Sequence, residues 1–436
     1  MKLSTLVIIS VLLTPASVSI AEEQVSWLPQ PLDLESALSI AVEGSNPAVR
    51  LAEARNAAAS AQLLNVEADD DLTVKASAHL LAVEPSDLSV NRTNNDSRAI
   101  LSARKKLYDF GRSDALEDAA RKRIGASHKL MKNDLGQHQL QVARYFFDVL
   151  LADQENVLTH EEMTLAFLAW DKAKDRHELG KLSDLELLEL ENKYRIKLQR
   201  RKISEQKQKL SRRQLALALN RPNDPPSKLV SPDVNWQAEL PTLDNVIEKA
   251  LAGNARLKAL QQHVDAAGQK LQAARLNNRP VLHGEMTIAD YHRETGSTHQ
   301  ATAGLLLEIP LYTGGRTNAA VSIAQAERDQ ALAELQLAQL RLREEASSLL
   351  LTLDTLKADL LALQVSESYG EIYLDKNRAL YELEVASDFG DAIVRVSEVA
   401  LKKMQSELDY AYTRMALAVL QGESLGKFSE PINTGK

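Results

Sequence analysis

The sequence predicts a mixed α and β protein in which long antiparallel helical hairpins and two β-hairpins occur in two similar halves. Prolines are absent from residues 86–221 and 311–430, so two stretches of more than a hundred residues lack the strongest helix breaker. Short motifs repeat at an offset of 204 residues, which indicates an internal duplication. Four segments between the expected helices alternate apolar and polar residues, which is typical of strands.

The N-terminal segment, residues 1–21, is predicted to be a cleavable export signal. An apolar run from Leu6 to Leu13 is followed by small residues at Ser19 and Ala21. The run is too short to span a membrane, which argues against the alternative of an N-terminal anchor. The absence of Cys excludes disulfide bonds and a lipid-modified cysteine, and the net charge of −8 gives no reason to expect nucleic acid.

The mature chain is predicted to contain two repeats, residues 22–220 and 243–422, with an equatorial connection at 221–242 and a tail at 423–436. Each repeat contains one long helix, at 113–179 and at 317–383. The second has leucines every seven residues, which is typical of a heptad seam. These are Leu335, Leu342, Leu349, Leu356 and Leu363, with the companion series Leu332, Ala346, Leu353 and Leu360. A helix of 67 residues is about 100 Å long, too long for a compact domain of this size.

Shorter helices flank each long helix. Leading helices are expected at 32–64 and 243–276, and returning helices at 183–220 and 387–422. Ser183 and a glutamate three residues later have capping-box spacing at the start of the first returning helix. A leading and a returning helix are each about half as long as the long helix, so end to end they would form a second rod of equal length.

Two β-hairpins, at 72–108 and 281–310, supply four strands, each with one apolar and one polar face. Unpaired strand edges and an exposed apolar face are unfavourable in water, and two arrangements would satisfy them. The hairpins pack on the helices of their own chain, or they pair with neighbouring copies and close a barrel in a membrane. Two copies would give eight strands and three would give twelve. Twelve strands can enclose a water-filled passage, whereas side chains fill an eight-stranded barrel.

The same turn follows each hairpin. The motifs LYDFGR, from Leu107, and LYTGGR, from Leu311, lie where an outgoing strand meets a long helix. Glycine permits a sharp change of backbone direction, and proline ends a strand ladder. The residues predicted to form these turns are Gly111, Arg112, Pro310, Gly314, Gly315 and Arg316.

Taken together, these residues resemble the TolC family of outer-membrane efflux proteins over nearly the whole chain, from about Leu32 to Gly422. The resemblance is carried by the duplicated halves, by LYDFGR and IPLYTGGR, and by ELGKLSDLELLE at the first helical tip. It implies a homotrimer in the outer membrane of a Gram-negative bacterium. A 12-stranded β-barrel would stand on a periplasmic α-helical barrel, with a belt formed by the N-terminal segment, residues 221–240 and the tail.

The resemblance also implies the function. The chain would be the outer-membrane component of a tripartite efflux or type I secretion system. It would be a passive exit duct for substrates that an inner-membrane transporter delivers through a periplasmic adaptor protein. Such a duct needs no catalytic residue, cofactor or metal, and its sequence does not identify the substrate. The alternative is a soluble periplasmic coiled-coil adaptor or structural rod. Adaptors usually carry one helical hairpin and a lipoyl-like domain, so two hairpins favour the duct.

The helical tips are the expected docking sites for the adaptor. The second tip departs from the family pattern, because Glu384 replaces the usual glycine and Gly390 occupies the usual acidic position. Asp388 and Asp391 lie close by and are the candidates for an acidic ring that narrows the periplasmic entrance. The docking candidates are Gly180, Ser183, Asp184, Glu186, Glu384 and Ser387.

Other features are interpreted as structural. The basic run at 195–213 is expected to be a solvated helix face, with an adaptor-facing patch as the functional alternative. The nine His residues are scattered, so no metal site is predicted. The first hairpin is atypical, because Asp69–Asp71 stands where the second half has Arg279 and a proline, and Lys106 stands where Pro310 does.

Overall fold

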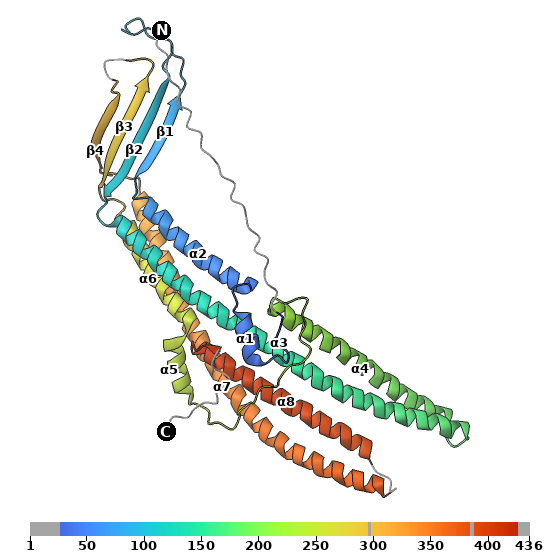
Figure 1. The fold of residues 1–436 in the computed structure, drawn as a ribbon. Helices are drawn as coiled ribbons and strands as arrows, with labels where there is room; N and C mark the ends of the chain where they lie inside the picture. The colour runs from blue at the N-terminus through green and yellow to red at the C-terminus, as the bar shows by residue number, and fades with distance from the viewer. Residues whose placement is uncertain (1–26, 295–297, 384–387, 426–436) are drawn as a thin grey trace.

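The computed structural model describes residues 27–294, 298–383 and 388–425. The predicted export signal and most of the C-terminal tail therefore lie outside the described residues. Within them the chain forms eight helices and four strands (Figure 1). The helices are α1 (Leu34–Ala41), α2 (Pro47–Ala68), α3 (Arg112–Glu178), α4 (Asp184–Ala218), α5 (Leu243–Gly253), α6 (Ala255–Arg275), α7 (Arg316–Glu382) and α8 (Phe389–Leu420). The strands are β1 (Thr73–His79), β2 (Arg98–Tyr108), β3 (Val281–Tyr291) and β4 (Ala301–Glu308).

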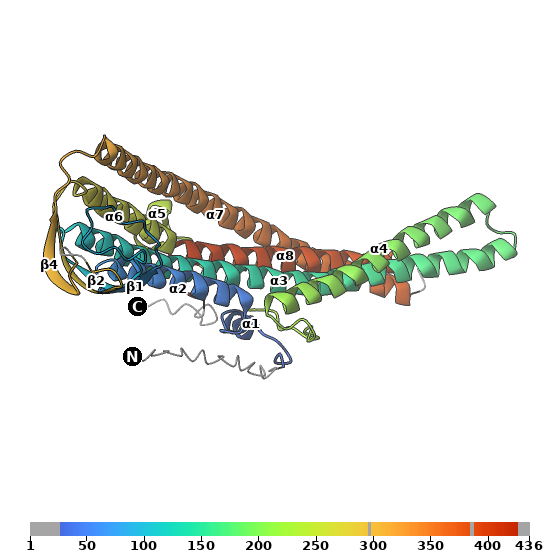
Figure 2. The same ribbon diagram turned by 90° about the horizontal axis from the view of Figure 1, so that it is seen from above.

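The helices α3 and α7 run the length of the helical part of the molecule (Figures 1 and 2). Each has 67 residues and begins and ends one residue before the span expected from the sequence. At about 1.5 Å per residue each is roughly 100 Å long. Their length therefore sets the length of the rod.

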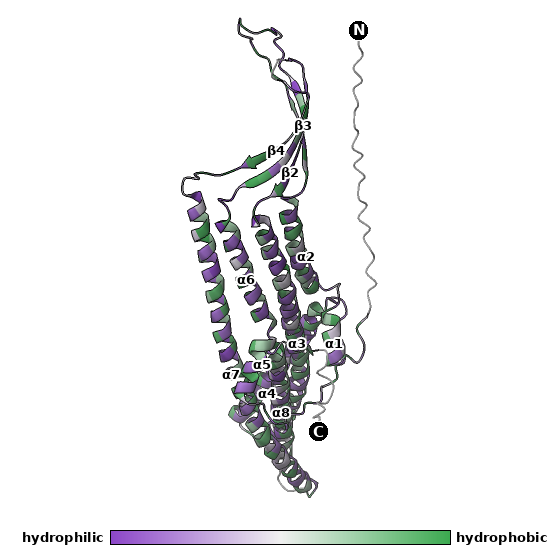
Figure 3. Cartoon of the chain, turned by 90° about the vertical axis from the view of Figure 1, so that its left-hand side faces the viewer, coloured by the Kyte–Doolittle hydropathy of each residue, from purple (hydrophilic) through white to green (hydrophobic). Residues whose placement is uncertain are grey.

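The helices stand side by side in one layer rather than around a closed core (Figure 3). Next to the sheet, α2 packs on α3, α3 on α6 and α6 on α7; in the far half, α4 packs on α3, α3 on α8 and α8 on α7. A layer one helix thick has two broad faces and two lateral edges. The edges are formed by α2 and α4 on one side and by α7 on the other.

Each leading helix is broken, so the continuous helices expected at 32–64 and 243–276 are wrong. Asn46 and Asn254 stand at the breaks, and their side-chain Oδ1 atoms accept from Ala48 N and Leu257 N at 3.0 Å in both cases. An asparagine that caps a new helix competes with continuation of the preceding one. The buried Nδ2 groups donate to the carbonyl of Ala218 at 3.0 Å and of Leu420 at 2.9 Å. Both repeats thus tie the break to the end of their returning helix.

The buried cores lie near the middle of the rod. One contains Phe146 and Phe147 of α3, packed with α1 and Met415 of α8. The second contains the heptad seam of α7, with Leu335, Leu342, Ala346, Leu353 and Leu360 buried. Val234, Trp236 and Leu240 of the connection pack against this second core, and Leu32 pairs with Leu229 as an isolated parallel bridge. The connection and the N-terminal part of the described chain therefore lie together on the outside of the helical layer.

The four strands form one antiparallel sheet in the order β1-β2-β3-β4. The β2–β3 pair joins the two repeats, with Leu101 opposite Ile288 and Arg104 opposite Glu285. Strands β1 and β4 are the free edges. The sheet extends beyond the ends of the helices, and in the described part of the chain no helix packs across either face (Figures 1 and 3).

Candidate functional site

One face of the sheet is apolar and exposed. The register aligns Val74, Ala103, Met286 and Ala303 in one row and Ala76, Leu101, Ile288 and Ala301 in the next. The large members of this face, Val74, Leu101, Met286, Ile288 and Leu305, are between 45% and 72% exposed. A sheet in water buries its apolar face against a second layer. This face therefore requires an apolar medium or a partner.

The opposite face is polar and more shielded. Lys75, Ser102, Thr287 and Thr302 share one row, and Arg104 forms an ion pair with Glu285 in the next. Thr287 and Glu285 are half-buried, whereas their apolar neighbours on β3 are exposed. The polar side of the sheet is therefore the concave one, the reverse of a sheet folded onto a core in water. This arrangement contradicts the alternative in which the hairpins pack on the helices of their own chain.

The sheet is incomplete in a single chain. The outer edges of β1 and β4 carry unpaired backbone groups over seven and eight residues. Such edges are completed by another strand or protected by bulges, charges or covering segments. Pairing with another strand would satisfy the edges, whereas the exposed apolar face still needs an apolar medium.

The strand-to-helix turns have the same backbone conformation in both repeats. Two successive residues adopt the left-handed region, Phe110 and Gly111 with φ of 59° and 86°, then Gly314 and Gly315 with φ of 62° and 81°. Arg112 and Arg316 are the first residues of α3 and α7, and Pro310 follows the end of β4. The offset of 204 residues thus also holds for backbone angles. Phe110 adopts this conformation without the freedom of glycine, and its ring packs on Tyr108 with centroids 4.8 Å apart.

Replacing Gly315 with alanine is expected to lower the free energy of unfolding by about 1–2 kcal/mol, because a Cβ is disfavoured at positive φ. Nothing lies within 4 Å of the added Cβ, so the cost is purely conformational. Thermal loss of the helical circular dichroism signal in detergent measures it. Gly304→Ala is the matched control, since Gly304 has open space and an ordinary φ. Equal shifts for the two variants would contradict this account of the turn.

The first turn has a polar network that its counterpart lacks. Lys106 Nζ lies 2.6 Å from Asp70 Oδ1 and 3.1 Å from Ser113 Oγ. Ser113 Oγ also lies 2.6 Å from Asp109 Oδ2, which accepts from the Ser113 backbone N–H at 3.0 Å. This network explains why the first hairpin differs in sequence from the second at this junction. The aspartates at 69–71 and Lys106 replace a proline-based junction with a hydrogen-bonded one.

The first helical tip is closed by two capping motifs. Gly180 has φ of 67°, and the N–H groups of Gly180 and Lys181 donate to the carbonyls of His177 and Arg176, both at 2.8 Å, as in a Schellman motif. Ser183 then caps α4. Its backbone N–H donates to Glu186 at 3.0 Å, while its hydroxyl accepts from the Glu186 N–H at 3.3 Å. The hydrogen bond from the Ser183 backbone lowers the pKa of Glu186. Gly180, Ser183, Asp184 and Glu186 are all exposed.

The second tip is described in part. Glu384 and Ser387 lie outside the described residues. Asp388 precedes α8 and Asp391 lies in its first turn, both exposed. The buried Asn377 of α7 accepts from the Asp388 N–H at 3.2 Å. Gly390 lies against Leu165 of α3, and a Cβ there would approach Leu165 to 2.9 Å. Close packing of α3 on α8 therefore leaves little room for a larger side chain at Gly390 unless Leu165 moves.

The basic run of α4 is largely exposed, as expected of a solvated face, but part of it pairs with carboxylates of α3. Lys197 Nζ lies 2.6 Å from Glu162 Oε1, and Arg200 binds the same carboxylate at 3.1 Å. Glu162 is buried on α3 and is therefore compensated by two cations. Two further pairs, Lys207–Glu155 at 2.5 Å and Arg212–Asp153 at 2.6 Å, continue along the same seam. Part of the run therefore joins α4 to α3.

Ionic contacts also join the two repeats. Arg144 of α3 binds Asp409 of α8 at 2.8 Å and lies 3.5 Å from Asp148 on its own helix. Burial raises the pKa of Asp148, and the cations Arg144 and Lys207 oppose that effect. The pairing ties α3 to α8 where the two repeats meet.

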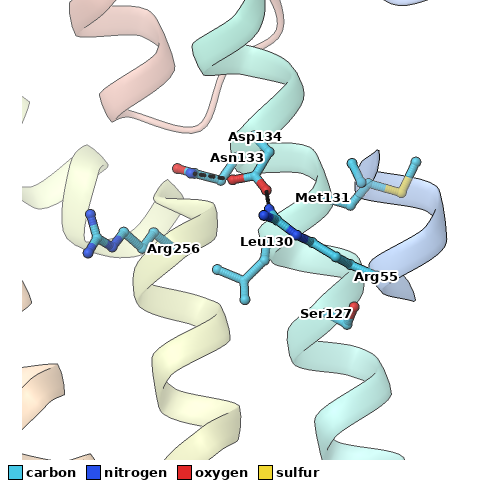
Figure 4. Close-up of a pocket in the computed structure, with 8 residues that line it drawn as sticks. Arg55, Ser127, Leu130, Met131, Asn133, Asp134 and Arg256 are labelled. Carbon is cyan, nitrogen blue, oxygen red and sulfur yellow. Dashed lines mark hydrogen bonds and ion pairs between the residues drawn. The ribbon is translucent and has the colours of Figure 1, made fainter. Parts of the chain in front are cut away.

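A pocket lies between α2, α3 and α6 (Figure 4). It has a volume of about 360 Å³. Its ionic groups largely satisfy one another, since Arg55 Nη1 lies 3.2 Å from Asp134 Oδ2, and Asn133 donates to the same carboxylate at 3.4 Å. Among the described residues, no group of three or more His, Cys, Asp or Glu side chains is placed to hold a metal ion. The pocket is therefore attributed to helix packing.

Comparison with known proteins shows which proteins this architecture resembles. Residues 246–423, from α5 to the end of α8, match the model of the outer membrane efflux protein family. The second repeat of this chain is thus similar to outer membrane efflux proteins. The resemblance drawn from the sequence is therefore confirmed. No relative is found among curated proteins.

Solved structures of similar fold cover nearly all of this chain. A membrane protein from Pseudomonas aeruginosa has a TM-score of 0.74 at 20% identity, over 90% of this chain and 91% of that one. The outer membrane channel CmeC of Campylobacter jejuni has a TM-score of 0.72 at 14% identity, over 89% and 85%. The open-state outer membrane channel MtrE of Neisseria gonorrhoeae has a TM-score of 0.70 at 16% identity, over 91% and 91%. At these identities the likeness establishes the fold.

None of the described helices is long and apolar enough to cross a membrane.

Proposed function

We propose that this chain is the outer-membrane channel of an efflux or type I secretion system. In this role it is a passive exit duct for substrates that an inner-membrane transporter delivers through a periplasmic adaptor. The observation that carries the proposal is the four-stranded sheet, with an exposed apolar face and two open edges, at one end of a 100 Å rod of helices. The likeness of the second repeat to outer membrane efflux proteins supports the same reading.

Three copies of the chain close the sheet. Four strands from each would give a 12-stranded barrel, with the apolar face toward lipid and the polar face toward a water-filled passage. An eight-stranded barrel from two copies would be filled by side chains and could not conduct solutes. Similarity to the outer membrane channels CmeC and MtrE therefore favours three copies over two.

The helical layer supplies matching lateral edges. On α4, apolar residues recur every seven positions and are 49% to 64% exposed: Ile196, Ile203, Leu210 and Leu217. On α7, exposed Leu351, Val365 and Ile372 keep the same seven-residue register. Two different edges, one on each side of the layer, form a head-to-tail interface that closes into a ring. Heptad seams of this kind pair helices along their length.

The far ends of the helical hairpins are proposed as the adaptor-docking surface. The first tip exposes Leu185 and Leu188 beside Ser183, Asp184 and Glu186, so an apolar patch lies next to carboxylates. The fixed Schellman and capping-box geometry holds this patch rigid. A rigid, partly apolar end suits binding of another helical hairpin.

Detergent extraction followed by mass measurement tests the proposed function. The mature protein is expected to remain in the membrane fraction until detergent is added, and then to have the mass of a trimer by light scattering. Reconstituted protein should conduct ions across planar bilayers. A monomer that stays soluble without detergent would instead support the periplasmic adaptor or structural rod.

Asp388 and Asp391 are proposed to line the periplasmic entrance in three copies. Replacing both with alanine is expected to weaken block by divalent cations and to change conductance, because a ring of carboxylates concentrates cations. Planar bilayer recordings with and without the divalent ion measure this. Asp184→Ala at the first tip is the matched control. Currents unchanged by the double substitution would exclude these two residues as the entrance ring.

A further inference from the structure

We propose that the barrel of this channel favours anionic solutes, because the sheet face that lines the passage carries unpaired cations. The inference rests on the proposed function, since the polar face surrounds a passage only in a closed barrel. It adds a charge preference for the transported solute, which neither the fold nor the family resemblance supplies.

The register fixes which charges share the polar face. Lys75 of β1 lies in a row of hydroxyl residues that ends at Thr302 of β4. Arg98 of β2 lies between His79 and Tyr291 in the row nearest the loops at the far end of the sheet. Because side chains alternate along a strand, both cations point to the side opposite Val74 and Ile288.

The described carboxylates of the polar face do not pair with Lys75 or Arg98. Glu285 is paired with Arg104, and Glu308 lies at the helix end of β4, opposite Val281. Lys106, at the same end, is held by Asp70. The half of the face that is farther from the helices therefore has no carboxylate among its strand-paired residues.

The remaining cations have no ionic partner among the described residues. Neither Lys75 nor Arg98 takes part in an ion pair within that part of the chain, and the buried Nε–H of Arg98 has no hydrogen-bond partner there. A buried donor without a partner is costly and is available to an incoming acceptor. In three copies, Lys75 and Arg98 would form two rings of positive charge. Rings of lysine and arginine favour anions in pores.

Measurement of reversal potential tests the preference. The whole channel is reconstituted in planar bilayers with a KCl gradient. The entrance carboxylates have the opposite sign, so the recordings use Asp388→Ala with Asp391→Ala as the background. In that background the reversal potential is expected to have the sign of chloride permeation. Adding Lys75→Glu and Arg98→Glu is expected to shift it to the sign of potassium permeation.

A charge swap provides the matched control. Arg104→Glu combined with Glu285→Arg exchanges a pair on the same face without changing its net charge, and the reversal potential is expected to stay on the chloride side. Conducting trimers with a potassium preference, or with a reversal potential insensitive to Lys75→Glu and Arg98→Glu, would overturn this inference and leave the channel intact. Protein that forms neither trimers nor pores would instead overturn the proposed function.

Discussion

Arginine at both Ile203 and Leu210 is expected to abolish the trimer while leaving the chain helical. These side chains belong to the apolar stripe of α4, on an edge helix whose other side packs on α3. Burying one such side chain between copies contributes about 1.5–3 kcal/mol to the free energy of assembly. The substitutions remove this contribution in each of three copies. A buried, unpaired guanidinium would add a penalty of several kcal/mol. The variant should therefore run as a monomer in detergent.

Light scattering during size-exclusion chromatography measures the mass, and circular dichroism verifies that the helices remain. Ile203→Leu with Leu210→Met is the matched control, because it keeps the stripe apolar at similar volume, and it should remain trimeric. A trimer that tolerates both arginines would place the contact between copies on another surface.

Gly253→Ala is expected to give the largest loss of stability of any single methyl addition considered for this chain. A Cβ at Gly253, the last residue of α5, would lie 1.8 Å from the carbonyl oxygen of Gln421, just after α8. The obstacle is backbone, so no side-chain rotation relieves it, and the two segments must move apart. Overpacking costs about 1–3 kcal/mol and more where the backbone shifts. The adjacent bond from Asn254 to Leu420 would be lost as well.

Gly44 provides the matched control, because it lies in the turn after α1, near the corresponding helix break of the first repeat, and has nothing within 4 Å of an added Cβ. Gly44→Ala should change stability by no more than about 0.5 kcal/mol. Thermal unfolding of the two variants in the same detergent compares them. Equal midpoints would mean that the contact between Gly253 and Gln421 does not constrain the fold.

Local periodicity in the sequence was sufficient to predict the positions of the long helices and of the strands. The proline-free stretches and the marks at an offset of 204 residues locate α3 and α7 to within one residue. Period-two alternation locates the strands, because a sheet with one polar and one apolar face has that pattern in any medium. The glycines of the two turns were also readable, since a repeated glycine at a strand-to-helix junction indicates positive φ.

Features that depend on tertiary contact were not readable from one sequence. Asn46 and Asn254 look like ordinary helix residues until the carbonyls of Ala218 and Leu420 are placed beside them. The capping signal before Pro47 was present and could have located the first break. Gly390 gives no local sign that Leu165 of α3 requires it to be small. The partners of the basic run on α4 lie 35 to 59 residues away on α3.

The equal lengths of α3 and α7 constrain how this protein can change in evolution. Both span the full distance from the sheet to the tips in one helical layer, with α6 and α8 between them. An insertion in the long helix of one repeat alone would place the two helical tips at different distances from the sheet. It would also disrupt the packing of that helix on its neighbours. A longer or shorter tube therefore needs matched insertions in both repeats, in steps of about seven residues that preserve the packing period. The internal duplication thus couples the lengths of the two repeats, so a change of length in one repeat requires the same change in the other.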